Sequence, residues 1–381
     1  MNPLLLQLRR LNKRGDEKAL DEFFQSHQFP IVEEDGVTFV YRGEADDVYL
    51  QHWVYGLPSY QRFHALDDDS DLWHLHLELP KGSRIEYKFN VVSEGKERLI
   101  EDPLNDLKAY DPFGANSVCR AYGYTPPEWT QPDPDARPGA IDDISMHSKI
   151  FASDRRFRLY LPARYRRSRN YPLLIVHDGN DYLNFASLQT VLDNLIHRLE
   201  IPPLIAALTH SSDRLVEYAA DLRHADHLAH ELLPYLEKRL PLVRRPEGRG
   251  LMGASFGAVA ALHAAWTHPD TYGRLLLQSG SFAFTDIGQH WRGPVFDPVV
   301  RFMNSFRKNP GKPAEKIFIS CGRYESLIYE NRSLVPLLQE NRLMQVRYRE
   351  ARDGHNWENW RDRLRDGLSW LFPGPLWMVY E

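Results

Sequence analysis

Apolar residues recur at every second position through much of the region between residues 29 and 125. Val37, Phe39 and Tyr41 follow this period, and so do the apolar residues of two later runs, over 73–79 and 85–91. Residues that favour turns, mainly glycine and proline, separate the runs. Strands with one apolar face and frequent turns are typical of antiparallel sheets that pack face to face. The pattern therefore predicts a β-sandwich domain over residues 29–125.

Two short segments of different character flank this region. Residues 1–28 carry two apolar stripes at helical spacing, one containing Leu4 and Leu8 and one containing Leu20 and Phe23. They predict an N-terminal helical segment. Residues 126–140 contain too many prolines for a helix or a central strand, so we expect a stiff linker there. The domain boundary should fall within this linker.

Beyond residue 140 short apolar runs alternate with longer stretches of helical character. The apolar runs are expected to be buried strands, at 173–176, 204–208, 248–252, 275–277, 317–319 and 344–348. The intervening helices are expected at 185–199, 225–239, 258–267, 329–340 and 357–371. This alternation indicates a mostly parallel sheet with helices on both faces. Residues 141–381 are therefore predicted to form an α/β domain.

One motif in this domain suggests a chemical function. Gly253, Ser255 and Gly257 form a single G-x-S-x-G sequence between a predicted strand and a predicted helix. A serine held on a tight strand-to-helix turn needs very small residues two positions before and after it, because any side chain there would strike the neighbouring backbone. The motif predicts that Ser255 is an exposed nucleophile at the end of its strand.

A serine hydroxyl becomes nucleophilic only when a base takes its proton, and that base needs an acid to orient it. In proteins with such a turn the three residues follow one another as serine, acid and histidine. His355 comes after the last predicted strand, and Glu325 comes just past the strand before it. We therefore assign His355 as the base and Glu325 as the acid. Asp353 and Glu330 remain the alternatives for the acid.

Further residues are expected beside the nucleophile. A tetrahedral intermediate carries a negative oxygen that needs amide donors, and the amides of Phe256 and Asn180 are the candidates for this oxyanion hole. Arg214 follows another predicted strand. It is expected either to bind an anionic or carbonyl group of the substrate or to pair with Glu217 and brace its own loop.

Composition narrows the class of partner. The chain has 381 residues, a formal net charge of −5 and 26% charged residues, which gives no reason to expect binding to nucleic acid or to a membrane. The first ten residues do not resemble a secretory signal, and Cys119 and Cys321 lie far apart without metal-binding spacing. We expect a cytoplasmic protein that acts on a small molecule and needs no metal or other cofactor. Nothing in the sequence indicates its oligomeric state.

Taken together, these residues resemble the putative-esterase branch of the α/β-hydrolases, and within it the enterochelin (enterobactin) esterases. The resemblance covers most of the chain and rests on Asp178-Gly179, Arg214-x-x-Glu217, Glu231-Leu232-Leu233-Pro234, Gly253-Ala254-Ser255-Phe256-Gly257, Gln278-Ser279-Gly280-Ser281, Gly322-Arg323-Tyr324-Glu325 and Asp353-Gly354-His355. In the N-terminal half, Tyr87-Lys88-Phe89 and Asp102-Pro103-Leu104-Asn105 look like parts of the immunoglobulin-like lid domain that precedes the hydrolase in that group.

The resemblance implies a catalytic triad of Ser255, Glu325 and His355 and ester hydrolysis through an acyl-enzyme. It further implies a substrate class, a ferric catecholate trilactone that is cleaved in the cytoplasm to release iron. Two departures concern the substrate: Asp353 stands where these esterases carry glycine, and the loop over 282–285 lacks their paired tryptophans.

Two other functions fit parts of the pattern. The first is a deacylase of acetylated or feruloylated carbohydrate, against which the lack of a secretion signal argues. The second belongs to another class: a carbohydrate-binding protein whose β domain binds glucan and whose hydrolase half is inert. The presence of all three residues, Ser255, Glu325 and His355, argues against it, because an inert enzyme would usually have lost one.

Overall fold

The structure is a computed structural model that describes residues 3–67, 70–285 and 291–375. Its chain divides into two compact units. The first comprises Met1–Thr125 together with two short later segments, Arg323–Glu325 and Arg352–His355, and the second comprises the remainder. Two loops of the C-terminal half therefore belong to the first unit, an arrangement that no local sequence pattern indicates.

Two amphipathic helices open the first unit, α1 (Pro3–Arg14) and α2 (Glu17–Ser26). Asp16 caps α2 by accepting a hydrogen bond from the amide of Ala19 at 3.1 Å. The apolar stripes bury Leu5, Leu8, Leu20 and Phe23 in a cluster that also contains residues of the following strands. The helical character expected from the spacing of these residues is thus present.

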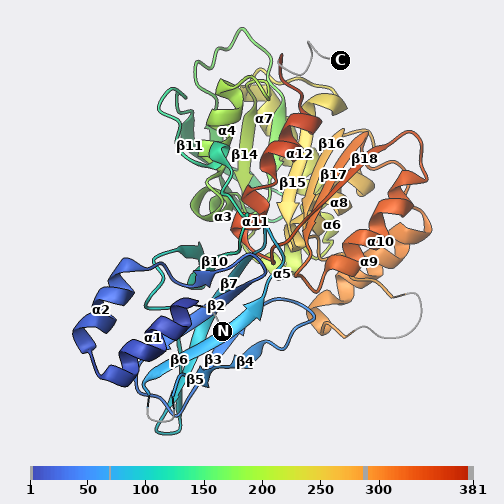
Figure 1. Cartoon of the computed structure of the whole chain (residues 1–381). Helices are drawn as coiled ribbons and strands as arrows, with labels where there is room; N and C mark the ends of the chain where they lie inside the picture. The colour runs from blue at the N-terminus through green and yellow to red at the C-terminus, as the bar shows by residue number, and fades with distance from the viewer. Residues whose placement is uncertain (1–2, 68–69, 286–290, 376–381) are drawn as a thin grey trace. The chain divides into compact units, whose positions relative to one another are not determined.

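Two antiparallel sheets form the rest of the first unit (Figure 1). One has the strand order β1-β2-β6-β5, and the other has the order β4-β3-β7-β10-β9 with β8 paired to β7. The strands are β1 (Ile31–Val32), β2 (Gly36–Arg42), β3 (Asp47–His52), β4 (Tyr60–Arg62), β5 (His64–Ala65), β6 (Leu72–Glu78), β7 (Arg84–Ser93), β8 (Lys96–Ile100), β9 (Lys108–Asp111) and β10 (Gly114–Arg120).

The two sheets share one hydrophobic core. Phe39 of β2 and Tyr87 of β7 come from different sheets, and their rings meet edge to face with centroids 4.8 Å apart. Both rings are fully buried, and they belong to one cluster with the other inward-facing residues of β2, β3, β6 and β7. Val37, Phe39 and Tyr41 of β2 face this core, whereas Val40 faces the cluster formed with α1 and α2, so both faces of β2 are buried.

A mixed sheet of eight strands organises the second unit, in the order β11-β12-β14-β13-β15-β16-β17-β18. Its strands are β11 (Ala140–Ser148), β12 (Ser153–Leu161), β13 (Leu173–Val176), β14 (Ile205–Thr209), β15 (Arg249–Ala254), β16 (Arg274–Gln278), β17 (Lys316–Gly322) and β18 (Gln345–Ala351). The strands from β14 to β18 pair in parallel, whereas β11 and β12 pair antiparallel at one side. The apolar runs of the sequence do not predict β11 and β12, because both strands contain many exposed residues.

Helices cover both faces of this sheet (Figure 1). Leu275 and Leu277 of β16 face one hydrophobic core, and Leu276 between them faces the other. The first core is completed by α6 (Leu222–Asp226), η2 (His227–Leu232), α7 (Leu233–Arg239), α8 (Phe256–Thr267), α9 (Asp297–Lys308) and α10 (Ile328–Gln339), and the second by α3 (Gly179–Phe185), α4 (Leu188–His197), α11 (Trp357–Arg361) and α12 (Leu364–Leu371). The remaining short helices are η1 (Glu128–Thr130), α5 (Arg214–Glu217), η3 (Pro246–Gly248) and η4 (Pro294–Phe296).

Helices expected as single elements are interrupted in two places. The predicted helix over 225–239 lies within a run of α6, a π-helical turn η2 and α7. Pro234 explains the wider turn, because a proline inside a helix clashes with the carbonyl four residues earlier, here that of His230. The predicted helix over 357–371 is divided into α11 and α12.

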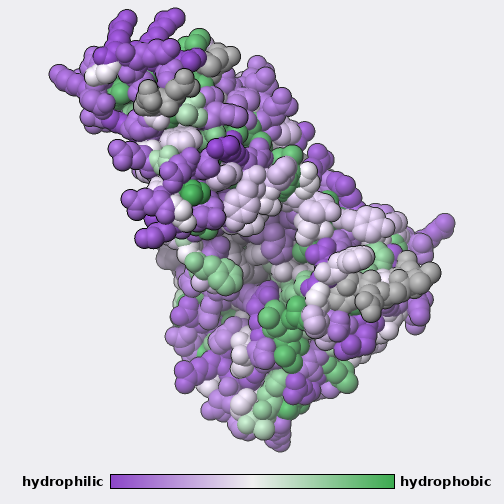
Figure 2. Space-filling model, turned by 90° about the horizontal axis from the view of Figure 1, so that it is seen from below, coloured by the Kyte–Doolittle hydropathy of each residue, from purple (hydrophilic) through white to green (hydrophobic). Residues whose placement is uncertain are grey.

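The surface facing the viewer in Figure 2 is mostly hydrophilic, with apolar residues in small separate areas. Among the residues that the structure describes, none of the helices combines the length and the hydropathy that a bilayer crossing requires.

Candidate functional site

Ser255 occupies a strained turn between β15 and α8. Its backbone angles are φ 57° and ψ −121°, a conformation that non-glycine residues rarely adopt and that costs roughly 1–3 kcal/mol. A Cβ atom on Gly253 would lie 2.4 Å from the carbonyl carbon and oxygen of Gly257, so only glycine fits at position 253. A Cβ atom on Gly257 would lie 3.1 Å from Cβ of His177. The turn therefore has the steric requirements that the motif predicted.

The Ser255 side chain is partly exposed and has a second hydroxyl beside it. Its Oγ lies 3.1 Å from Oγ of Ser281, which follows β16 and is 2% exposed. The backbone holds the turn in place, because the Ser255 amide donates to the carbonyl of Gln278 at 2.9 Å and the Ser281 amide donates to the carbonyl of Ser255 at 3.2 Å. Ser281 ends the motif Gln278-Ser279-Gly280-Ser281, which contributes to the family resemblance but from which the sequence alone predicts no role for this residue.

His355 and Glu325 form a pair. Nδ1 of His355 lies 2.7 Å from Oε2 of Glu325. The Glu325 side chain is 1% exposed, whereas that of His355 is 37% exposed. The carboxylate is therefore buried against the imidazole, while part of the ring is open to solvent. A buried carboxylate at Nδ1 fixes the tautomer of a histidine and stabilises its protonated form.

The two alternative acids have other partners. Asp353 accepts from the buried Arg84, whose Nη1 lies 3.2 Å from Oδ1, and from the amide of Gly354 at 2.7 Å. Glu330 lies in α10 and accepts from Nε of Arg292 at 3.1 Å. The geometry around His355 thus favours Glu325 over both.

The segments that carry the predicted site residues leave the sheet at one edge. Asn180 follows β13, Ser255 follows β15, Glu325 follows β17 and His355 follows β18. These strands run parallel, so all four segments start from the carboxyl ends of strands. In open α/β sheets ligands bind outside these ends.

The two predicted oxyanion donors lie at helix N-termini that follow neighbouring strands. Phe256 is the first residue of α8, and Asn180 is the second residue of α3. Amides in the first turn of a helix have no partner within the helix and point outward along its axis. The α3 turn packs closely, since a Cβ atom on Gly179 would lie 2.4 Å from Cα of Leu208.

Arg214 pairs with Asp178 and not with Glu217. Nε of Arg214 lies 3.0 and 2.9 Å from the two carboxylate oxygens of Asp178, so Asp178 takes the place of Glu217 in the second of the two alternatives. Burial disfavours the charged guanidinium, but the Asp178 carboxylate outweighs this effect and raises the pKa of Arg214. The Arg214 side chain remains 37% exposed, so part of it stays available to a ligand.

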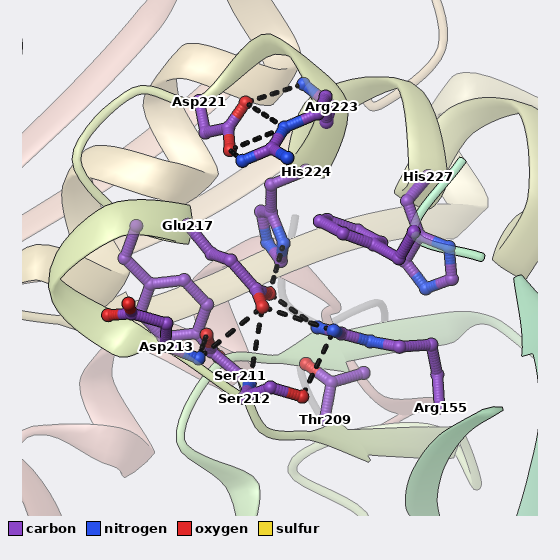
Figure 3. Close-up of polar contacts among 12 residues, drawn as sticks. Arg155, Thr209, Ser211, Ser212, Asp213, Glu217, Asp221, Arg223, His224 and His227 are labelled. Carbon is purple, nitrogen blue, oxygen red and sulfur yellow. Dashed lines mark hydrogen bonds and ion pairs between the residues drawn. The ribbon is translucent and has the colours of Figure 1, made fainter. Parts of the chain in front are cut away.

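Glu217 belongs instead to a buried ionic cluster (Figure 3). Its Oε1 accepts from Nη1 of Arg155 at 3.0 Å, and Nδ1 of His224 lies 3.7 Å from its Oε2. Burial opposes ionisation of Glu217, but the neighbouring His224 and the hydrogen bond from Arg155 lower its pKa. Sequence reasoning missed Arg155 because it lies on β12, whose alternating pattern gave no sign of a buried charge.

Two histidines extend this cluster toward the strand that carries Ser255. Nε2 of His224 lies 3.1 Å from Nε2 of His177, and Nδ1 of His177 lies 3.0 Å from the carbonyl of Met252 in β15. His177 is completely buried, and burial together with the neighbouring His224 lowers its pKa to about 3. The ring is therefore neutral at physiological pH, and because its Nδ1–H donates to the carbonyl, its Nε2 accepts from His224.

Comparison with known proteins assigns the family. The family model described as "Putative esterase" matches residues 148–371. An iron(III) enterobactin esterase of Escherichia coli O6:H1 is 25% identical over 278 residues, which cover 71% of this chain and 66% of that relative.

Solved structures share the fold. The enterobactin esterase of Shigella flexneri, solved in the presence of enterobactin, matches with a TM-score of 0.74 and 20% identity over 95% of this chain and 99% of that one. A ferulic acid esterase of Anaeromyces mucronatus, in complex with ferulic acid, matches with a TM-score of 0.52 and 17% identity over 64% of this chain and 95% of that one. With more than half of its length matched by the family model, the chain belongs to the esterase family described as "Putative esterase" and is a carboxylic ester hydrolase.

Proposed function

We propose that the protein is a serine esterase that works through an acyl-enzyme, with Ser255 as nucleophile, His355 as general base and Glu325 as the orienting acid. The observation that carries this proposal is the buried Glu325 carboxylate 2.7 Å from Nδ1 of a half-exposed His355. It is supported by the strained glycine-flanked turn at Ser255, which costs stability and has no evident structural benefit.

In the first step His355 removes the proton of the Ser255 hydroxyl while the oxygen attacks the ester carbonyl carbon. The protonated ring is stabilised by Glu325, which stays ionised. The tetrahedral intermediate then collapses, the ester C–O bond breaks, and His355 returns the proton to the leaving alcohol. The acyl group remains on Ser255.

In the second step water takes the place of the alcohol. His355 removes a proton from the water, hydroxide oxygen attacks the acyl carbon, and the Ser255 oxygen leaves and recovers its proton. In both steps the carbonyl oxygen becomes negative. We assign its stabilisation to the amides of Phe256 and Asn180, because both are first-turn amides of helices that follow neighbouring strands.

For the substrate we propose a ferric siderophore ester of the enterobactin type. Support comes from the enterobactin esterases among the relatives and from the fold shared over nearly the whole chain. We assign to the exposed part of Arg214 a contact with an anionic group of such a substrate, since a guanidinium suits catecholate or carboxylate oxygens. By the same resemblance we propose that the sandwich of the first unit is an immunoglobulin-like lid domain and that iron is released in the cytoplasm.

A second candidate is the hydrolysis of a feruloyl or acetyl ester of carbohydrate. The shared fold with a ferulic acid esterase favours it, although that match covers 64% of this chain, against 95% for the enterobactin esterase. The inert carbohydrate-binding protein is the third candidate, and the His355–Glu325 pair argues against it.

A fluorophosphonate probe tests the nucleophile. We expect the native protein to be labelled at Ser255, and labelling to disappear in Ser255→Ala and in His355→Ala. Ser281→Ala is the matched control, because it removes a hydroxyl that lies 3.1 Å from that of Ser255. We expect this variant to be labelled as the native protein is. Native protein that resists the probe would favour the inert binding protein.

Parallel turnover assays test the substrate. Ferric enterobactin and a feruloylated or acetylated xylo-oligosaccharide are compared by kcat/KM with the same preparation. We expect turnover of the siderophore ester to dominate. Turnover of the sugar ester alone would replace the first candidate with the second.

A further inference from the structure

A cluster of two histidines and one aspartate lies away from the proposed catalytic residues. Asp226 is the last residue of α6, His230 lies in η2, and His268 is the C-cap residue of α8. One side-chain ligand atom from each of the three lies within 4.8 Å of those of the other two. The sequence predicted no metal site, because 37 residues separate His230 from His268 in the chain and no metal-ligand spacing joins them.

The fold brings these residues together for identifiable reasons. Asp226 and His230 are four residues apart in one continuous helical run, which places them on the same side of it. Helix α6 packs against α8 (Figure 1), so the end of α8 presents His268 to that side. Nε2 of His268 lies 2.9 Å from Oδ1 of Asp226, and the rings of His230 and His268 meet edge to face with centroids 4.7 Å apart.

We infer that Asp226, His230 and His268 form a binding site for a zinc-like divalent cation. Two imidazole nitrogens and one carboxylate oxygen are a ligand set that zinc accepts, with its fourth position open to water. Ligands about 2.0–2.2 Å from a tetrahedral zinc lie roughly 3.4 Å from one another, so the three ligand atoms, now within 4.8 Å of one another, would draw closer on binding.

Accessibility and geometry both distinguish this cluster from an ordinary ion pair. His230 is exposed, while the His268 and Asp226 side chains are 15% and 36% exposed. An ion can therefore reach the cluster from solvent and bind beside the partly buried pair of His268 and Asp226. A hydrogen bond between His268 and Asp226 alone would leave the position of His230 unexplained. His147 and Asp154 form another pair at the same 2.9 Å, and they serve below as the comparison.

The site is structural and not part of ester hydrolysis. Helix α8 has 12 residues, so its C-terminal end lies about 18 Å along the axis from the turn that carries Ser255. A bound ion would tie the end of α8 to the π-helical turn η2, which Pro234 weakens by removing a helix hydrogen bond. Zinc should therefore stabilise the folded protein without being required for turnover.

The experiment measures zinc binding and thermal unfolding of the intact chain after treatment with a chelator. We expect one Zn²⁺ per chain by calorimetry and a melting temperature raised by at least about 2 °C at saturating zinc. His230→Ala, His268→Gln and Asp226→Asn should each weaken zinc binding at least tenfold and abolish the thermal shift. His230→Ala is the most informative variant, because its side chain is exposed and its removal should leave folding intact.

His147→Ala is the matched control and should bind zinc as the wild type does. Mg²⁺ and Ca²⁺ should not replace zinc, since these ions prefer oxygen ligands. The inference is overturned if the wild type binds no stoichiometric zinc, if His230→Ala binds it as tightly as the wild type, or if Ca²⁺ binds in its place. Esterase activity is recorded separately, so a failure of the proposed catalytic mechanism would not be mistaken for a failure of this site.

Discussion

Nδ1 of His355 lies 2.7 Å from Oε2 of a Glu325 side chain that is 1% exposed. An amide in place of the carboxylate cannot neutralise the protonated imidazole, and it also permits the wrong tautomer. We therefore expect Glu325→Gln to lower kcat by about 10³–10⁴-fold with little effect on folding. Steady-state kinetics on an activated ester, with circular dichroism to check the fold, measures this effect.

Glu330→Gln is the matched control for Glu325→Gln, because Glu330 lies in α10 and its carboxylate pairs with Arg292. It should retain most of the activity. If Glu330→Gln or Asp353→Asn removed activity while Glu325→Gln did not, the assignment of the acid would be wrong.

Gly253 tests the steric requirement of the turn. A Cβ atom there would lie 2.4 Å from backbone atoms of Gly257, which cannot move without displacing the start of α8. We expect Gly253→Ala to destabilise the fold by about 2–4 kcal/mol and to remove most activity. In Gly257→Ala the new Cβ atom would lie 3.1 Å from its nearest neighbour, Cβ of His177. We expect this variant to lose less stability than Gly253→Ala. Urea unfolding measures the free energy of unfolding of both variants, and an equal loss of stability in the two would contradict the steric argument.

The buried His177 should make the protein sensitive to acid. Burial, aided by His224, lowers its pKa from 6.5 to about 3, so the folded protein keeps this ring neutral. Below pH 6.5 the unfolded chain binds a proton that the folded protein does not. The contribution of His177 to stability is therefore complete above pH 6.5, and it declines by up to about 1.4 kcal/mol per pH unit as the pH falls from about 6.5 toward 3.

Urea unfolding between about pH 7.5 and 5.5 measures this slope. His177→Gln should reduce it, whereas His147→Gln should not, because the His147 side chain is 64% exposed. A slope that is unchanged in His177→Gln would show that other groups cause the acid sensitivity.

Arg214 offers a test of substrate charge. If its exposed part binds an anionic group, Arg214→Ala should raise KM for an anionic ester by about tenfold or more and change KM for a neutral ester of the same acyl group much less. Arg214 also has a structural role that does not depend on substrate, because it pairs with Asp178, whose side chain is 6% exposed. An equal rise in KM for the anionic and the neutral ester would mean that Arg214 only holds Asp178 in place.

A double-mutant cycle isolates that internal role. Arg214→Ala leaves a buried carboxylate without its guanidinium, whereas the added change Asp178→Asn removes the charge. We expect a coupling energy between Arg214 and Asp178 of about 1–3 kcal/mol in urea unfolding. A coupling energy near zero would mean that the contact contributes nothing measurable to stability.

Features that depend on local sterics and on strand order are readable from the sequence. Gly253 is required by atoms of Gly257 and Ala258, within three residues of Ser255, so the motif alone indicates the strained serine. Glu325 and His355 could be proposed from the sequence because each comes just after a strand, and parallel strands end at one edge of their sheet, but Asp353 and Glu330 stayed open as alternatives for the acid.

Features that depend on distances between separate segments are not readable in this way. Arg214 precedes Glu217 by three residues, yet Asp178, 36 residues away, is its partner because the turn after β13 lies beside that of α5. The same is true of Asp226, His230 and His268, which only the packing of α6 against α8 brings together.

The sequence by itself therefore determined the α/β class of the second unit and the strained turn at Ser255, because periodicity and tight turns are set by neighbours along the chain. The tertiary structure alone decided which carboxylate meets His355, where Arg214 makes its ion pair and that Asp226, His230 and His268 come together. These depend on how loops with little local preference are placed by the packing of the sheet and helices that carry them.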